Sequence, residues 1–175
     1  YGAGNTAWLG DYKGVTMLFA ERHGVAVALA CSAPWLKRSA GFVGRSDGWQ
    51  DLQAHKQMTW SFDRADNGNV ALVGEVDLHA AGGAFVLALG LGRNSREAAH
   101  QALASLDDRF DRVWDEYVAE WHQWQDSLLL PAASEPKAPG RDLLRVSASV
   151  RRAHESKHFP GGGVASLSIP WGTSK

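Results

Sequence analysis

The fold class follows from residues 15–32, VTMLFAERHGVAVALACS. Residues 15–20 and 24–32 are short apolar runs rich in β-branched side chains, and the turn-like residues 21–24 separate them. Two such runs joined by a tight turn are typical of a β-hairpin. The stretch therefore predicts two neighbouring antiparallel strands.

Further strands are predicted downstream of this pair. Residues 57–63 (QMTWSFD) alternate polar and apolar, residues 65–69 (ADNGN) have turn chemistry, and residues 70–78 (VALVGEVDL) resume the alternation. Residues 84–91 (AFVLALGL) add a fifth strand. Five strands with short connections and no helix between them predict an antiparallel sheet, half solvated or packed on a second sheet.

The residues between the two hairpins, 32–54, read as a long irregular loop rich in Gly, Ser and Trp. Within it, Trp49 stands among small polar residues, with Asp47 and Asp51 nearby. The indole can stack on a sugar ring, or the loop can pack over the sheet with its aspartates bonded to the backbone. We favour the second, structural interpretation.

A helical pattern begins at Asn94, which with Glu97 three residues later forms a capping signal. Large apolar side chains then recur at spacings of four and three, namely Phe110, Trp114, Tyr117, Trp121, Trp124 and Leu128. One apolar helix face of this size cannot face water. We therefore expect the stripe to be buried against a neighbouring domain rather than to serve as a sugar platform.

The helix is expected to end at Pro131, and residues 132–140 (AASEPKAPG) form a Pro-rich connector that is a candidate domain boundary. A further helix is predicted from Arg141 to about Lys157. Residues 164–172 (VASLSIPWG) read as extended. Because the chain starts with Tyr1 and stops soon after an apolar segment, both ends are interpreted as cuts in a longer protein.

Charge and motif content exclude several functions. The 18 Lys and Arg residues are scattered among 19 acidic ones, which argues against nucleic acid or a membrane surface as partner. The seven histidines show no metal-ligand spacing, so no metal site and no cofactor are expected. Cys31 lies in an apolar run and is expected to be a buried, unpaired thiol.

Three segments resemble one enzyme family. They are GFVGRSDGWQDL (41–52), GNVALVGEVDL (68–78) followed by FVLALGLG (85–92), and HESKHFPGGGVASLSIPWG (154–172). These residues resemble bacterial glucoamylases and glucodextranases of glycoside hydrolase family 15. The resemblance extends from about Thr6 to Gly172.

The resemblance implies a mixed fold, in which part of an antiparallel β super-sandwich is followed by a linker helix and the first helix of an (α/α)6 barrel. On this basis residues 1–93 are assigned to the N-terminal β-sandwich domain, residues 94–140 to the helical linker and connector, and residues 141–175 to the start of the catalytic barrel. The family's sandwich is longer than residues 1–93. Its first strands would therefore lie outside this chain.

The implied activity is inverting, exo-acting hydrolysis of α-glucosides, which releases β-glucose from non-reducing ends. Both catalytic glutamates of the family come from later sequence, so no catalytic residue is expected in this chain. Trp171 and Ser166 are expected at the edge of the substrate pocket. The implied partners are an α-glucan or α-glucoside substrate and the rest of the same enzyme, whether joined to the chain or bound as separate pieces of a nicked protein.

The chain alone is expected to be inactive, and both a secreted and a cytoplasmic bacterial location fit the sequence. An alternative function stays open, in which a non-catalytic β-sandwich binds glucan through Trp35, Trp49 and residues 41–52, or serves as a structural module.

Overall fold

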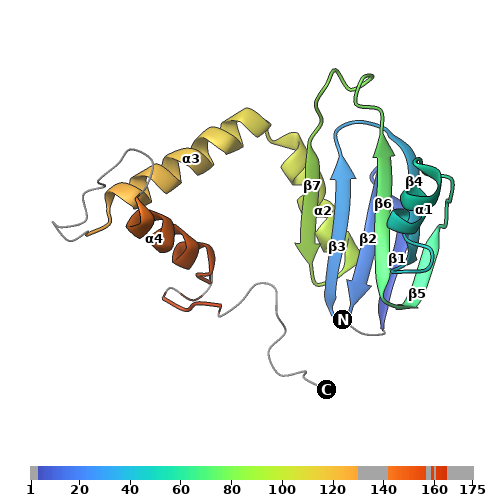
Figure 1. Ribbon diagram of the computed structural model, residues 1–175, viewed down its shortest axis with the longest axis horizontal. Coiled ribbons are helices and arrows are strands. Elements are labelled where there is room, and N and C mark those ends of the chain that lie inside the picture. Colours follow the sequence, from blue (N-terminus) through green and yellow to red (C-terminus); the bar gives the residue numbers. More distant parts are fainter. Residues whose placement is uncertain (1–3, 130–141, 157–158, 160, 165–175) are drawn as a thin grey trace. The chain divides into compact units, whose positions relative to one another are not determined.

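The computed structural model describes residues 4–129, 142–156, 159 and 161–164 (Figure 1). The chain divides into two compact units, Tyr1–Val113 and Trp114–Lys175. The elements in chain order are β1 (Asn5–Tyr12), β2 (Val15–Arg22), β3 (Val25–Cys31), β4 (Trp35–Phe42), α1 (Gly48–His55), β5 (Arg64–Gly68), β6 (Val70–Val76), β7 (Leu87–Gly92), α2 (Ser95–Asp107), α3 (Phe110–Asp126) and α4 (Leu143–Ala153).

Five strands form the larger sheet, in the order β5-β1-β2-β3-β7, and every pair is antiparallel. The β2–β3 hairpin confirms the pairing predicted from residues 15–32. Its two turn residues, His23 and Gly24, have φ values of 45° and 77°. Positive φ at both central positions matches the twist of hairpin strands, so this local turn sets the register of β2 on β3.

A second, two-stranded antiparallel sheet of β4 and β6 packs on one face of the larger sheet and contacts β1 and β2. Ala7 and Leu18, which point to this side, are completely buried. The described residues thus form an antiparallel β-sandwich of seven strands followed by helices, which confirms the predicted class of fold.

Helix α2 covers the opposite face of the larger sheet. The buried cluster on this side consists of small residues and two larger ones: Met17, Phe19, Ala26, Ala28, Ala30, Ala88, Ala98, Ala99 and Ala102. Gly90 of β7 lies directly beneath the helix, because a Cβ atom there would come within 2.0 Å of the Ala98 carbonyl oxygen. Only the absence of a side chain at Gly90 lets helix and strand approach this closely.

The side of β7 that points away from α2 is exposed. Ala88 and Gly90 are buried, whereas the alternating residues Leu89 and Leu91 are 59% and 62% exposed. The strand therefore has one packed face and one apolar face that the described residues leave open.

The hairpin predicted from residues 57–63 and 70–78 is wrong. Residues 57–63 form no strand, and the predicted turn residues 65–69 mostly belong to β5, which pairs with β1 in the other sheet. The sequence pattern predicted no strand at β1, the partner of β5. Pairing between distant segments overrides the turn preference of Asp66, Asn67 and Gly68 here.

The interpretation of residues 32–54 as irregular is also wrong, because they contain β4 and all but the last residue of α1. Residues of β4 pair with β6 some thirty positions later, as in Phe42↔Val70 and Ala40↔Leu72. Such a long-range partner leaves no signal in the local sequence. Buried Cys31 is a free thiol, as expected.

The helix start at Asn94 is confirmed, since its side chain accepts a hydrogen bond of 2.9 Å from the Glu97 N–H. The single long helix expected after it is instead two helices, because Asp108 adopts an extended conformation (ψ 141°). The predicted helix after Arg141 is present as α4, and no helix in the described part of the chain is long and apolar enough to cross a membrane. The connector 132–140 lies outside the described residues, as do residues 165–172 of the predicted extended segment.

Replacing Gly90 with Ala is expected to force α2 away from the sheet. Overpacking against backbone atoms should lower the free energy of unfolding by about 3 kcal/mol or more. The control is Leu89→Val on the same strand, where the exposed side chain should change stability by no more than about 0.5 kcal/mol. Urea titration of both variants measures the difference, and equal midpoints would contradict the packing of α2.

Candidate functional site

Helix α1 is held on the smaller sheet by its first residues. Asp47 caps the helix, and its carboxylate accepts hydrogen bonds from the N–H groups of Gln50 (2.8 Å) and Gly44. Gly48 lies against β6, because a Cβ atom there would meet Val73 side-chain carbons at 2.6 Å. The helix N-terminus is therefore fixed in position.

Asp51, which is 1% exposed, ties α1 to the segment that follows it. Its carboxylate accepts hydrogen bonds from the Thr59 N–H (2.6 Å), the Thr59 hydroxyl (2.5 Å) and the Trp60 N–H (2.8 Å), and His55 Nδ1 lies 2.9 Å away. Burial raises the pKa of Asp51, but the bonds from Thr59, Trp60 and His55 outweigh it and hold the pKa well below its usual range. Asp51 is therefore a charged structural link.

The two interpretations of residues 41–52 are now resolved in part. The bonds from Asp47 and Asp51 to backbone N–H groups confirm the structural interpretation for these aspartates. Trp49, in contrast, is 68% exposed and does not pack over the sheet. Trp35 has a packing role, since its indole N–H donates to the Thr16 carbonyl oxygen (3.1 Å) and its ring covers Gly74.

The second unit contains a helix pair, α3 and α4. The rings of α3 contact one another in sequence, with centroid distances of 6.4 Å for Trp114–Tyr117, 6.1 Å for Tyr117–Trp121 and 5.5 Å for Trp121–Trp124. At the end of α3, the Gln125 amide donates to the Ser149 hydroxyl (2.5 Å), and Arg145 donates to the Gln125 carbonyl oxygen (2.7 Å). These polar contacts position α4 beside the rings.

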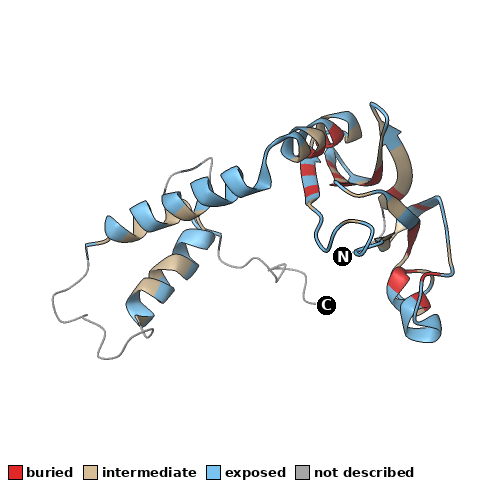
Figure 2. Ribbon diagram, turned by 90° about the horizontal axis from the view of Figure 1, so that it is seen from above, coloured by how far each residue is buried: buried red, intermediate tan, exposed pale blue. Residues whose placement is uncertain are grey.

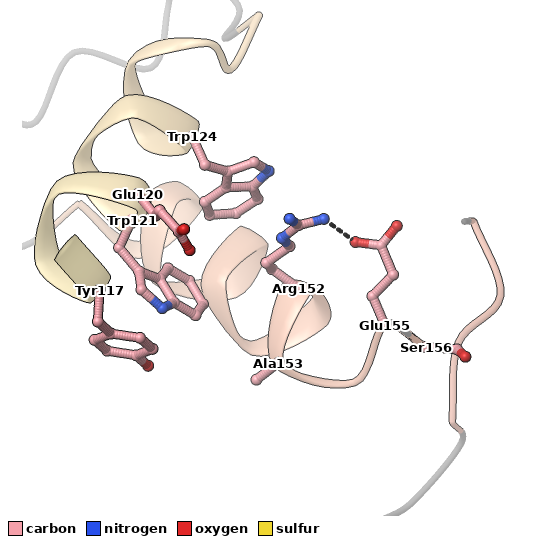
Figure 3. Close-up of a pocket in the computed structure, with 8 residues that line it drawn as sticks. All are labelled: Tyr117, Glu120, Trp121, Trp124, Arg152, Ala153, Glu155 and Ser156. Carbon is pink, nitrogen blue, oxygen red and sulfur yellow. Dashed lines mark hydrogen bonds and ion pairs between the residues drawn. The ribbon is translucent and has the colours of Figure 1, made fainter. Parts of the chain in front are cut away.

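A cavity of about 710 Å³ lies between the two helices (Figure 3). We call it the aromatic cradle; its lining consists of Tyr117, Glu120, Trp121, Trp124, Arg152, Ala153, Glu155 and Ser156. The Arg152 guanidinium lies 5.8 Å from the Trp124 ring centroid and pairs with the Glu155 carboxylate. The Gly161 N–H and Arg152 together lower the pKa of Glu155.

Glu155, one of the two glutamates that line the cradle, does not have the surroundings of a general acid. A general acid needs a pKa raised toward neutrality, whereas hydrogen bonds and Arg152 lower the pKa of Glu155. Among the described residues, no group of three or more His, Cys, Asp or Glu side chains could hold a metal ion. Ser166 and Trp171, the residues expected near substrate, lie outside the described residues.

The aromatic stripe is largely uncovered. Phe110, Trp114 and Tyr117 are 55%, 55% and 53% exposed, and no described residue of α3 or α4 is buried (Figure 2). The described residues therefore do not supply the expected covering of the stripe, and its burial against a neighbouring domain stays a prediction.

Asp51→Asn should lower stability at neutral pH, because it replaces a charged acceptor of several hydrogen bonds. The folded-state pKa of Asp51 is depressed, so its contribution is present above the unfolded pKa of about 3.9 and is lost as pH falls below it. The wild type should therefore lose stability below about pH 4, and the difference between wild type and variant should shrink there. Asp63→Asn, which replaces an exposed carboxylate, is the control; a pH-independent difference for Asp51→Asn would contradict this role.

Comparison with known proteins places these features in a family. The family model described as "Glucodextranase, domain N" matches residues 1–126. The chain is 32% identical over 156 residues to a glucoamylase of Clostridium sp. (strain G0005), a match covering 89% of the chain and 21% of that protein.

A solved structure, a bacterial glucoamylase complexed with acarbose, is also similar. The TM-score is 0.82 at 30% identity, over 98% of this chain and 24% of the other. The chain thus spans about a fifth to a quarter of the length of these relatives. With a matching family model over residues 1–126 and a shared fold, the chain belongs to the glucodextranase domain N family of glucoamylase-type proteins.

Proposed function

We propose that this chain is part of a larger parent protein that hydrolyses α-glucosides from the non-reducing end, inverts the anomeric centre and releases β-glucose. The family match and the similarity to two glucoamylases support a glycoside hydrolase parent. The single observation that carries most weight is the TM-score of 0.82 over nearly the whole chain to a glucoamylase bound to acarbose.

In this proposal the chain contributes structure rather than catalytic groups. Residues 1–93 belong to the N-terminal sandwich, residues 94–140 lead from it to the barrel, with α2 packed on the sheet, and residues 141–175 begin the catalytic (α/α)6 barrel. Ser166 and Trp171 line the edge of the substrate pocket. The Gly161 N–H and Arg152, which lower the pKa of Glu155, support a structural role for Glu155 rather than that of a general acid.

The chemistry would be performed by two carboxyl groups in the rest of the parent protein. One protonates the leaving oxygen, and the other activates a water on the opposite face of the sugar. In inverting enzymes the two groups are about 6.5–9.5 Å apart, because the water must fit between one of them and the anomeric carbon. The product then leaves as the β-anomer.

A non-catalytic glucan-binding module is the second candidate. It is favoured by one observation, the 68% exposure of Trp49 on a helix fixed by Asp47 and Asp51. An exposed indole on a rigid helix can stack on a sugar ring. Retention of the chain on an amylopectin gel, lost in Trp49→Ala and kept in Trp114→Ala, would favour this candidate.

The proposed activity predicts different results for the chain and its parent. The purified 175-residue chain should release no glucose from maltooligosaccharides, because in this proposal both catalytic carboxyl groups lie in the rest of the parent. The parent should release β-glucose, which proton NMR detects before mutarotation. Glucose release by the chain alone, or α-glucose as the first product of the parent, would contradict the proposal.

Burial of the ring stripe gives a second expectation. Removing a fully buried Trp costs about 3–5 kcal/mol, so Trp121→Ala should lower the stability of the parent by this amount. In the chain alone the effect should be smaller, because no residue of α3 is buried there. Denaturant unfolding measures both, and a change within about 0.5 kcal/mol in the parent would place the stripe at the surface.

A further inference from the structure

We propose that the aromatic cradle receives one positively charged side chain, Lys or Arg, carried by the part of the parent protein outside this chain. The inference rests on the proposed function only in taking the chain to be part of a larger protein. It assigns a partner chemistry to a surface that is open in the described residues.

The first reason to expect a cation is the charge of the residues that line the cradle. Arg152 pairs with Glu155, so these two lining charges neutralise each other. Glu120 is exposed, lies beside the Trp121 and Trp124 rings (Figure 3) and forms no ion pair with any other described residue. Among the described residues that line the cavity, one carboxylate therefore has no cation paired with it.

The second reason is the attraction of the aromatic rings for cations. The faces of Trp and Tyr rings attract cations, and this unit already shows such a contact, with Arg152 at 5.8 Å from the Trp124 ring centroid. Tyr117, Trp121 and the Glu120 carboxylate offer the same chemistry on the other side of the cavity. An aromatic wall next to a carboxylate fits a Lys or Arg head with its apolar stem.

The mutual angles of the rings argue against a sugar as the occupant. Tyr117 and Trp121 meet at 61°, and Trp121 and Trp124 at 84°. These edge-to-face pairs form walls around a space instead of one flat platform on which a pyranose ring could lie. A narrow side chain that enters between the walls matches this geometry better.

The source of the cation follows from exposure and size. Tyr117 and Trp114 are more than half exposed on the same helix face, and the cavity of about 710 Å³ is larger than one side chain. The cation should therefore arrive with apolar surface around it, as part of a folded element. The relatives have about three-quarters or more of their length outside the region that this chain matches, which supplies such an element.

Thermal unfolding of the parent protein and of the 175-residue chain tests the proposal. In the parent, Glu120→Gln should lower the midpoint by about 2 °C or more at low salt, and Glu120→Lys should lower it further through repulsion. In 1 M salt both effects should shrink only in part, because a charge pair that the parent buries is screened much less than an exposed pair. In the chain alone, neither variant should shift the midpoint, because the proposed cation belongs to the rest of the parent protein.

The control is Asp115→Asn, which removes an exposed carboxylate from the same helix and should shift neither midpoint. An unchanged parent midpoint for Glu120→Gln overturns the proposal. An equal shift in parent and chain also overturns it, because the cation would then belong to this chain. A wild-type chain stabilised by maltoheptaose, with the effect lost in Glu120→Gln, would identify a sugar as occupant and overturn it too. Glucose release is measured separately, so a failed proposal on activity leaves this test intact.

Discussion

The close approach of α2 to the sheet is the contact on which the first unit depends. Gly90 leaves room for the Ala98 carbonyl, and the alanines of β3 and α2 form a flat apolar interface. Because small residues bring backbones together, many weak dispersion contacts accumulate over a short helix. Asn94 fixes where this helix begins. The helix after β7 is thus part of the sandwich core rather than only a connection to later sequence.

Local signals in the sequence predicted the parts of the fold that depend on neighbouring residues. The turn at His23 and Gly24 and the cap at Asn94 each act within a few positions, so the β2–β3 hairpin and the start of α2 were correct. The pairings of β1 with β5 and of β4 with β6 join distant segments. The hydrophobic periodicity of a segment does not identify a distant pairing partner. The turn-forming residues of β5 led to the prediction of a turn where the structure has a strand.

The same distinction holds for the candidate sites. The spacing of the rings on α3 predicted their common face, but the cradle needs α4, positioned by Gln125 and Ser149 from separate helices. The aspartates of residues 41–52 were recognised as backbone acceptors. Their partners at Thr59 and Trp60 were not, because they follow Asp51 by eight and nine positions. In the sequence, only an acidic residue followed some eight positions later by Thr59 hints at these hydrogen bonds.

The two similar proteins extend well beyond the region that this chain matches. The described residues provide a rigid sandwich, a fixed α1 with an exposed Trp49, and a pair of helices with an open aromatic surface. In the proposed function, these features support the parts of the parent protein that bind and hydrolyse the substrate. The proposed division of labour therefore places binding and support here and proton transfer elsewhere.

Backbone hydrogen exchange tests most directly whether α2 is part of the sandwich core. Core elements open only with global unfolding, whereas exposed helices exchange through local opening. The amides of Ser95–Asp107 should be protected to the same degree as those of Val25–Cys31, and those of Phe110–Asp126 should exchange far faster. If α2 exchanged as fast as α3 while β3 stayed protected, the helix would be a loosely attached linker, and the account of the core would be wrong.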